Sequence, residues 1–188
     1  NNEWIELYNP GDTAVDLANW TLTAEDGQPA VDLSGVIGAK AYYLLERTGD
    51  ETVPDVSADL VYTGALGNQG EVLRLVDAGS STVDRVNAAD GWPAGNNETK
   101  KTMELGAQSG WQTSQAFGGT PGQANSPGQA EDEDDETEEA VASDESAEEA
   151  DSGADGTILP DDQGKDWESG DIVVNEFVSD PADGQTEW

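Results

Sequence analysis

The sequence predicts an all-β protein, folded as a sandwich or a barrel of short strands. Apolar and polar residues alternate with a period of two in several short runs, which is typical of half-buried strands. Glycine, proline, asparagine and aspartate separate these runs, as turns between strands do. No apolar period of 3.6 residues persists long enough to indicate a helix. Together these three observations favour strands throughout the folded region.

The first strand is expected at residues 2–8, where two different faces alternate along the chain. The sequence Asn9-Pro10-Gly11-Asp12 ends it, because proline has no backbone N–H for a sheet and glycine accepts positive φ. Residues 14–17 lead into a hairpin at residues 20–33, which turns at Asp26-Gly27, a favoured two-residue hairpin sequence. A further turn is expected between Gly35 and Gly38.

The most apolar run, residues 42–47, is predicted to be a strand that is buried on both faces. Residues 48–58 are polar and contain Pro54, which indicates a loop. Further strands are expected at residues 60–62, 72–77, 82–87 and 102–105, with a loop at residues 88–97 and an ordered coil at residues 110–113. The folded domain is therefore expected to cover residues 1–125.

The composition excludes several classes of function. The 188 residues include 41 acidic residues against 7 lysines and arginines, a formal net charge of -34 that repels nucleic-acid phosphates. Direct nucleic-acid binding is therefore not expected. With no cysteine and no histidine, the chain cannot form a disulfide framework, a thiolate nucleophile, a Ser-His-Asp triad or an ordinary zinc site. The sequence also contains no apolar run long enough to cross a bilayer, so no membrane-spanning segment is expected in it.

Residues 126–170 differ from the folded region in composition. The run Glu131–Glu136 and the acidic groups after it have almost no large apolar residues among them. Such a segment repels itself and buries too little apolar surface to offset an ordering entropy of about 1–2 kcal/mol per residue. It is predicted to be a disordered acidic linker. One further strand is expected after it, at residues 172–178.

Several motifs together resemble the lamin tail domain family, in the form found in secreted and surface proteins of prokaryotes. They lie, in the family's order, at residues 3–9, 17–22, 42–45, 68–77, 110–113 and 118–125. The resemblance covers nearly all of residues 1–125 and implies an immunoglobulin-like β-sandwich. The family's usual first strand resembles residues 172–177, so here it is missing before residue 1 and present after residue 170.

The strand at residues 172–178 therefore looks like the first strand of a second lamin-tail-like repeat, over residues 171–188. The closing pair Glu187-Trp188 repeats Glu3-Trp4, which supports this interpretation. A sandwich without its first strand has an unpaired edge and an uncovered apolar groove. We predict that the strand completes the same sandwich, in effect a circular permutation, or pairs with a neighbouring chain. The long linker permits this, because the entropy cost of closing a loop grows only logarithmically with its length.

No catalytic, cofactor-binding or metal-binding residue is assigned from the sequence. Close carboxylate pairs are frequent in such an acidic chain, and we interpret them as a solvated acidic surface because no pattern separates an acid from a base. Residues 118–122 lack the lysine and the following helix of a phosphate-binding loop, so we expect a terminal turn there.

Calcium is the one cation for which the sequence offers ligands. Asp50-Glu51, Asp180 with Asp183, or the acidic run would supply oxygens, but none has the spacing of a high-affinity calcium loop. Weak or diffuse calcium binding is expected, without a defined site. Adaptation to high salt would explain the same acidity, and the composition does not separate the two causes.

The tryptophans differ in their sequence surroundings. Trp4, Trp20 and Trp111 lie in the family-like motifs and are predicted to pack in the core or at its edge. Trp92 stands beside Pro93 in a loop rich in glycine and asparagine, and it is expected to be exposed. Trp92 is therefore our candidate for a partner-binding residue.

The resemblance implies binding or tethering rather than catalysis. Lamin tail domains of animal lamins bind proteins and chromatin, and the prokaryotic relatives resemble add-on domains of secreted or surface proteins. We therefore expect a non-catalytic, extracellular or cell-surface module of a protein with tandem lamin tail domains, with an unknown protein or glycan as its ligand. The alternative is an accessory domain of a secreted hydrolase or nuclease whose catalytic part lies outside this sequence.

Overall fold

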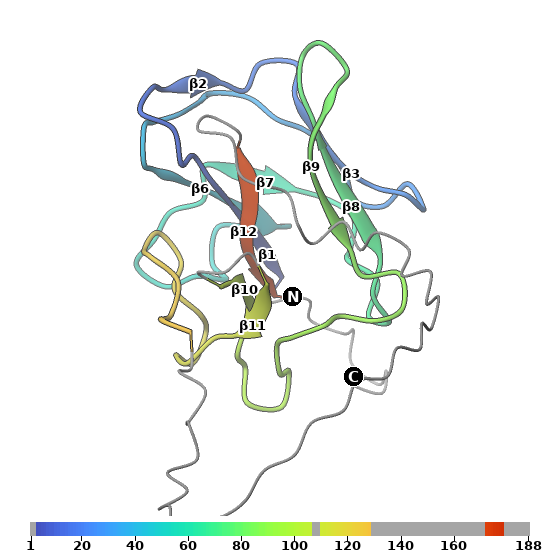
Figure 1. The fold of residues 1–188 in the computed structure, drawn as a ribbon, viewed down its shortest axis with the longest axis vertical. Helices are drawn as coiled ribbons and strands as arrows, with labels where there is room; N and C mark the ends of the chain where they lie inside the picture. Colours follow the sequence, from blue (N-terminus) through green and yellow to red (C-terminus); the bar gives the residue numbers. More distant parts are fainter. Residues whose placement is uncertain (1–2, 107–109, 129–171, 179–188) are drawn as a thin grey trace, which may run out of the picture.

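A computed structural model describes residues 3–106, 110–128 and 172–178, and every regular element in these ranges is a β-strand. A six-stranded sheet has the order β11-β10-β12-β1-β6-β7, and a four-stranded sheet has the order β4-β3-β8-β9 (Figure 1). The strands are β1 (Trp4–Tyr8), β2 (Val15–Asp16), β3 (Thr21–Ala24), β4 (Ala30–Asp32), β5 (Val36–Ile37), β6 (Tyr42–Arg47), β7 (Leu60–Tyr62), β8 (Val72–Val76), β9 (Thr82–Asn87), β10 (Met103–Leu105), β11 (Trp111–Thr113) and β12 (Val173–Val178).

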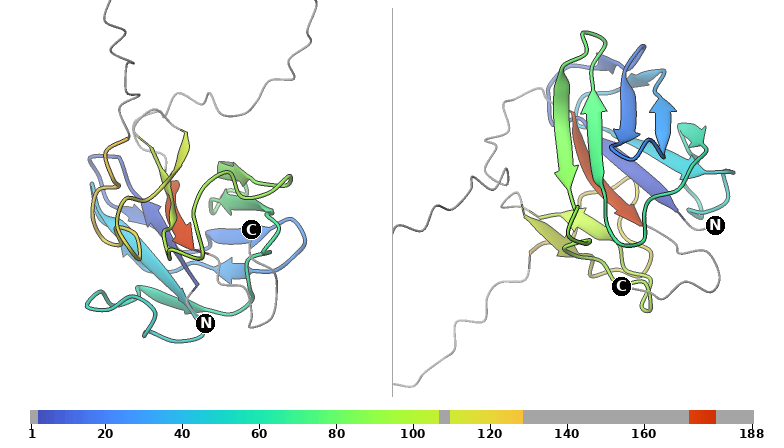
Figure 2. Two further views of the ribbon diagram at one scale, coloured as in Figure 1. Left: turned by 90° about the horizontal axis from the view of Figure 1, so that it is seen from below. Right: turned by 90° about the vertical axis from the view of Figure 1, so that its right-hand side faces the viewer.

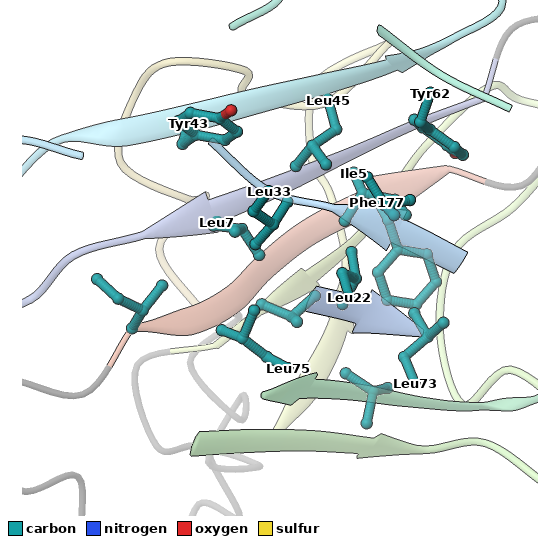
Figure 3. Packing of buried hydrophobic residues seen from close by; sticks show 14 of the residues in the cluster. Ile5, Leu7, Leu22, Leu33, Tyr43, Leu45, Tyr62, Leu73, Leu75 and Phe177 are labelled. Atoms are coloured by element: carbon teal, nitrogen blue, oxygen red, sulfur yellow. The ribbon is translucent and has the colours of Figure 1, made fainter. Parts of the chain in front are cut away.

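The two larger sheets enclose one hydrophobic core, which confirms the predicted β-sandwich (Figure 3). Ile5 and Leu7 lie two residues apart on β1 and therefore share the inner face of the six-stranded sheet. They belong to one buried cluster with Leu22, Leu73 and Leu75 of the four-stranded sheet. Full burial of each such side chain contributes about 1.5–3 kcal/mol, so this cluster supplies much of the free energy of folding.

The outer face of the six-stranded sheet is buried as well. Trp4 packs there against Leu44 and Val53 in a second, smaller cluster. Val53 comes from the loop that follows β6, so this loop covers part of the face. The prediction that residues 42–47 form a strand buried on both faces is therefore confirmed for the middle of β6, from Tyr43 to Glu46.

β12 lies in the middle of the six-stranded sheet, between β1 and β10 (Figure 2). It pairs antiparallel with the whole of β1, from Trp4 to Tyr8, and with Met103 and Glu104 of β10. The prediction that this strand completes the sandwich of residues 3–128 is confirmed. Its place differs from the one expected, because β12 fills a gap inside the sheet and not an outer edge.

Two short strands replace an expected turn and an expected coil. β5 lies between Gly35 and Gly38 and pairs with β2, with Ile37 opposite Val15. β11 lies in the expected coil at residues 110–113 and pairs with β10. Neither segment shows an alternating apolar pattern, so only pairing with β2 and with β10 reveals these two strands.

Candidate functional site: a strand slot and a row of buried carboxylates

The strand slot is the gap between β1 and β10 that β12 fills. Phe177 lies opposite Ile5 of β1 on one side and opposite Met103 of β10 on the other. Towards the start of β12, pairing with β1 continues as far as Val173, whereas β10 has already ended. The slot therefore holds the end of β12 between two strands and its beginning beside one.

A side chain from the opposite sheet replaces the missing strand neighbour at the beginning of β12. Asp84 of β9 is buried, and its Oδ2 accepts a hydrogen bond of 2.8 Å from the backbone N–H of Val174. A buried N–H group without a partner costs about 1–3 kcal/mol, so this carboxylate satisfies a group that would otherwise destabilise the slot. The hydrogen bond also connects the two sheets of the sandwich through β12.

A β-bulge at Asn175 fits β12 to the slot. The register with β1 shifts beside the Glu6–Glu176 pair, which leaves Asn175 as the extra residue of β12. Val174 and Phe177 are three residues apart and would lie on opposite faces of a regular strand, yet both are in the inner core. The bulge also lets Asn175 Nδ2 donate a hydrogen bond of 3.0 Å to Glu6 Oε1.

Phe177 anchors β12 between two tryptophans. Its ring centroid lies 4.8 Å from that of Trp92 and 5.5 Å from that of Trp111, both in edge-on geometry. Each such aromatic pair contributes about 0.5–1.5 kcal/mol beyond the burial of its surface. Phe177 is fully buried, so these contacts lie at the centre of the slot.

The exposure that the sequence suggested for Trp92 is corrected by the structure. Trp92 is partly buried against the inner core, and its Nε1 donates a hydrogen bond of 2.8 Å to the carbonyl oxygen of Gly67. Its main aromatic partner, Phe177, is distant in sequence, and therefore the local sequence gave no sign of burial. The predicted packing roles of the other three tryptophans are confirmed: Trp4 is buried, and Trp20 and Trp111 pack against the core. The partner-binding role of Trp92 stays a prediction.

A row of three glutamates crosses the outer face of the sheet at the slot. Glu176 of β12 lies opposite Glu6 of β1 and opposite Glu104 of β10, and all three are fully buried. We call these residues the carboxylate row. Like charges directly opposite one another on neighbouring strands destabilise a sheet, so the row requires either donors or protons.

The donors come from the covering coil, which we define as residues 114–126. Each carboxyl group of the row accepts a hydrogen bond from a backbone N–H of this coil: Gly122 N to Glu6 Oε2 at 2.6 Å, Thr120 N to Glu176 Oε1 at 3.0 Å and Ser126 N to Glu104 Oε1 at 3.0 Å. The terminal turn expected at residues 118–122 lies in this coil. Since a coil has no neighbouring strand to accept its N–H groups, the row takes that role.

Side-chain contacts strengthen the same connection. Asn125 of the covering coil and Asn175 of β12 donate to each other through their amides, with both distances 2.9 Å. Thr120 Oγ1 lies 3.0 Å from Glu176 Oε2, and Thr102 Oγ1 donates to Glu176 Oε1. The covering coil and β12 are therefore bonded to each other and to the sheet.

Two members of the carboxylate row, Glu6 and Glu176, hold protons more tightly than ordinary carboxyl groups do. Burial raises the pKa of Glu6 to about 8, against the opposing effect of hydrogen bonds from Gly122 and Asn175. Burial likewise raises the pKa of Glu176 to about 7, against hydrogen bonds from Thr102 and Thr120. The neighbouring carboxyl groups add to both shifts: Glu176 acts on Glu6, and Glu104 acts on Glu176.

Glu3, Glu46 and Glu71, which are also buried, connect other loops to the sandwich. Each accepts hydrogen bonds from loop N–H groups: Glu3 from Leu66 at 3.1 Å, Glu46 from Thr52 at 2.8 Å and Val53 at 3.0 Å, and Glu71 from Gly67 at 3.0 Å. Burial raises the pKa of Glu3 despite hydrogen bonds from Tyr62 and Leu66 and the charge of Arg47, and it raises the pKa of Glu71 to about 7.

The interpretation of the acidic residues as a solvated surface is therefore wrong for these six glutamates. A weak signal was present in the sequence, because Glu6, Glu46 and Glu176 stand inside strand runs that are mostly apolar. An acidic residue within such a run lies on a strand face, and here that face is covered by a loop or coil.

The candidate calcium ligands do not come together in the part of the chain that the structure describes. Asp50 is exposed, and its Oδ1 accepts a hydrogen bond of 2.7 Å from the N–H of Ala58 in its own loop. Asp180, Asp183 and the acidic run lie outside the described residues. Among residues 3–106, 110–128 and 172–178, no group of three or more acidic residues is placed to hold a metal ion.

The fold and the site define an immunoglobulin-like β-sandwich that holds an extended strand inside one of its sheets. Residues 1–90 match the family model described as the Lamin Tail Domain. This match confirms, over residues 1–90, the resemblance to the lamin tail domain family seen in the sequence. Members of that family are generally non-catalytic binding modules. The residues of β10, β11 and β12 follow the matched segment. No curated protein and no solved structure matches the chain significantly. The described part of the chain has no helix that would be long and apolar enough to span a membrane.

Proposed function

We propose that this chain is a non-catalytic binding and tethering module of an extracellular protein with tandem lamin tail domains. The observation that carries the proposal is the fit of β12 in the strand slot. β12 resembles the usual first strand of the family and lies after the other strands of the sandwich in sequence. A strand of the first-strand type after residue 170 supports the start of a second module there. The acidic segment, residues 126–170, would then connect the two modules.

The non-catalytic part of the proposal is supported by the surroundings of the carboxylate row. Glu6 and Glu176 are the carboxyl groups of the row with the properties of an acid and a base, since they lie opposite each other and have raised pKa values. Their oxygens accept hydrogen bonds from the covering coil and from Asn175, and the groups are fully buried. Their surroundings therefore fit a role in holding a strand and a coil in place.

The extracellular location is tested on cells of the source organism with an antibody against the sandwich. We expect the antibody to bind intact and permeabilised cells equally. An antibody against a cytoplasmic marker should bind only the permeabilised cells. A signal that requires permeabilisation would contradict the location.

The tandem arrangement is tested on the intact natural protein by limited proteolysis. Cleavage in the acidic segment should release at least two β-rich fragments, each recognised as a lamin tail domain by its peptide masses. A protein with a single such fragment, together with a fragment that hydrolyses nucleic acid, glycan or ester substrates, would instead favour the accessory-domain function.

The partner-binding role of Trp92 is part of the proposal and needs a matched control. Trp92→Ala and Trp111→Ala each remove a ring that contacts Phe177, so both weaken the hold on β12. On an array of purified glycans and surface proteins from the same cells, binding that depends on Trp92 should be lost in Trp92→Ala and kept in Trp111→Ala. Equal binding by Trp92→Ala and the unmodified chain would remove Trp92 from the site.

A further inference from the structure

The strand slot recognises features of β12 itself and not of the chain that leads to it. The inner face of the slot takes Phe177 between two tryptophans, and Asp84 takes the N–H of Val174. The outer face takes Glu176 and the bulged Asn175. This is the pattern of strand addition, in which backbone pairing supplies affinity and side-chain pockets supply specificity. Any copy of β12 offers the same features.

The length of the connection allows β12 to reach beyond its own sandwich. Residues 129–171 separate the covering coil from β12 in sequence. A peptide of this length reaches on the order of 100 Å when it is extended, which exceeds the diameter of a small domain. Nothing in the contacts of the slot distinguishes a strand that arrives from the same chain from one that arrives from another.

We propose that the strand slot of one molecule binds the β12 strand of a second copy of this chain, so that copies are linked by strand exchange. This inference rests on the proposed tethering function. It names the partner of the tethering module, which is a second copy of the same chain. Reciprocal exchange between two molecules gives a closed dimer, and one-way exchange gives a chain of modules.

Concentration and salt control the balance between the two arrangements. A tethered strand has an effective concentration in the millimolar range at its own slot, so the intramolecular arrangement dominates in dilute solution. Two molecules with a formal net charge of -34 each also repel one another until salt screens the charge. The exchanged form is therefore expected to increase with protein concentration and with ionic strength.

Disulfide trapping between full-length chains tests the inference, since the native chain has no cysteine. Tyr8 of β1 lies opposite Val173 of β12, and directly opposed residues are close enough for a disulfide. A Tyr8→Cys chain with a size tag is mixed with an untagged Val173→Cys chain, unfolded in urea, refolded together at high protein and salt concentration, and oxidised. The out-of-register control replaces Val173→Cys by Val178→Cys, because Val178 lies opposite Trp4 at the far end of β1.

The expected result is a tagged–untagged heterodimer that forms several-fold more in the matched mixture than in the control and disappears with reductant. Light scattering should then give twice the mass of one chain for a reciprocal dimer. Equal heterodimer in both mixtures, or none in either, would overturn the inference. A chain that carries both Tyr8→Cys and Val173→Cys checks the pair itself through an internal disulfide. Disulfide trapping uses purified chains, so its result is independent of the tests of cellular location and tandem organisation. Either proposal can therefore fail without the other.

Discussion

At the scale of single residues, protonation and packing are coupled in the carboxylate row. Glu6 lies opposite Glu176 and faces the covering coil through the N–H of Gly122. Its burial makes the charged form costly, and the like charges of Glu176 and Asp59 add to that cost. The hydrogen bonds of Gly122 and Asn175 stabilise the charge but do not outweigh burial, because the pKa of Glu6 is still raised to about 8.

Glu6→Gln is expected to reduce the pH dependence of stability. In the unfolded chain the pKa of Glu6 is near its ordinary value of 4.5, and in the folded chain it is about 8. Between these values the folded state keeps a proton that the unfolded state has lost, so the free energy of unfolding falls as pH rises. The loss amounts to about 1.4 kcal/mol per pH unit for one such group, and the contribution is complete below pH 4.5. Urea unfolding at several pH values between 5 and 8 measures the slope.

The control for this prediction is Glu98→Gln, which removes an exposed carboxyl group. This substitution should leave the change in the free energy of unfolding with pH the same as in the unmodified protein. Glu176→Gln should reduce the slope as Glu6→Gln does, because burial raises the pKa of Glu176 to about 7 as well. If the stability of Glu6→Gln fell with pH as steeply as that of the unmodified protein, Glu6 would not be a source of the dependence.

The two phenylalanines of the chain give a matched pair of substitutions. Phe177→Ala empties the space between Trp92 and Trp111 and should destabilise the protein by about 3–5 kcal/mol. Phe117 is 79% exposed, so Phe117→Ala should change the free energy of unfolding by less than about 0.5 kcal/mol. Chemical unfolding followed by circular dichroism compares the two, and equal effects would contradict the place assigned to Phe177.

At the scale of elements, β12 is the strand on which the six-stranded sheet depends. Removal of residues 170–188 takes away one of the two neighbours of β1 and of β10 and exposes the inner face of the slot. The melting temperature should fall, with a loss of several kcal/mol in the free energy of unfolding, because buried apolar surface and strand pairing disappear together. An unchanged melting temperature after this deletion would contradict the role of β12.

A second deletion distinguishes the contribution of β12 to stability from that of the acidic segment before it. Removal of residues 135–155 keeps β12 and shortens only the connection. Because loop-closure entropy changes by only about 0.6 kcal/mol for each twofold change in length, stability should stay within about 1 kcal/mol. A loss as large as that of the first deletion would show that the acidic segment itself supports the fold.

The covering coil depends on a close approach at Gly119. Gly118 and Gly119 have nearly the same backbone conformation, with φ of 76° and 78°. A Cβ atom at Gly118 would meet nothing within 4 Å, whereas one at Gly119 would overlap Glu176 Oε1 and lie 2.6 Å from Thr102 Oγ1. Gly118→Ala should therefore show only the cost of its left-handed conformation, about 1–2 kcal/mol.

Gly119→Ala should lose a further 1–3 kcal/mol or so, because the coil must move away from the sheet. Thermal melts of the two variants, side by side, provide the comparison. Equal losses would mean that the contact between Gly119 and Glu176 is not close in solution.

At the scale of the whole molecule, the charge dominates the response to ions. A formal net charge of -34 destabilises the compact state by self-repulsion, and salt reduces that repulsion. The melting temperature should rise with sodium chloride, and calcium and magnesium at matched ionic strength should have equal effects. A shift that saturates with calcium alone would contradict diffuse binding and point to a specific site.

Much of the sandwich was predictable because its longer strands alternate between two faces. β1, β8 and β9 each show this pattern over five or six residues, and β6 was recognised as an apolar run buried on both faces. Each of the four lies close to its expected range. β5 and β11 were missed because their short sequences, Val36-Ile37 and Trp111-Gln112-Thr113, do not alternate. The strand at residues 172–178 was recognised by type, but its central position follows from pairing with β10, which leaves no sequence signal.

The strand slot was less predictable, because its parts come from distant segments. The contact of Trp92 with Phe177 joins a loop to a strand that is distant in sequence, and local patterns cannot relate the two. The bulge at Asn175 is defined by the register with β1, and no feature of the strand's own sequence marks it. The carboxylate row was not predicted because the chain has 41 acidic residues. A glutamate that a coil covers in the fold does not differ in sequence from one that is exposed.

The central place of β12 also has a consequence in time. A ribosome adds roughly 5–20 residues per second, so β12 emerges seconds after the covering coil has left the exit tunnel. During that interval the nascent sandwich has all the other strands of its sheet and a vacancy at the centre. On a crowded polysome, a β12 strand that was synthesised slightly earlier on a neighbouring ribosome would reach the vacancy first. The order of synthesis, and not only the strength of the contacts, then decides which molecules become connected.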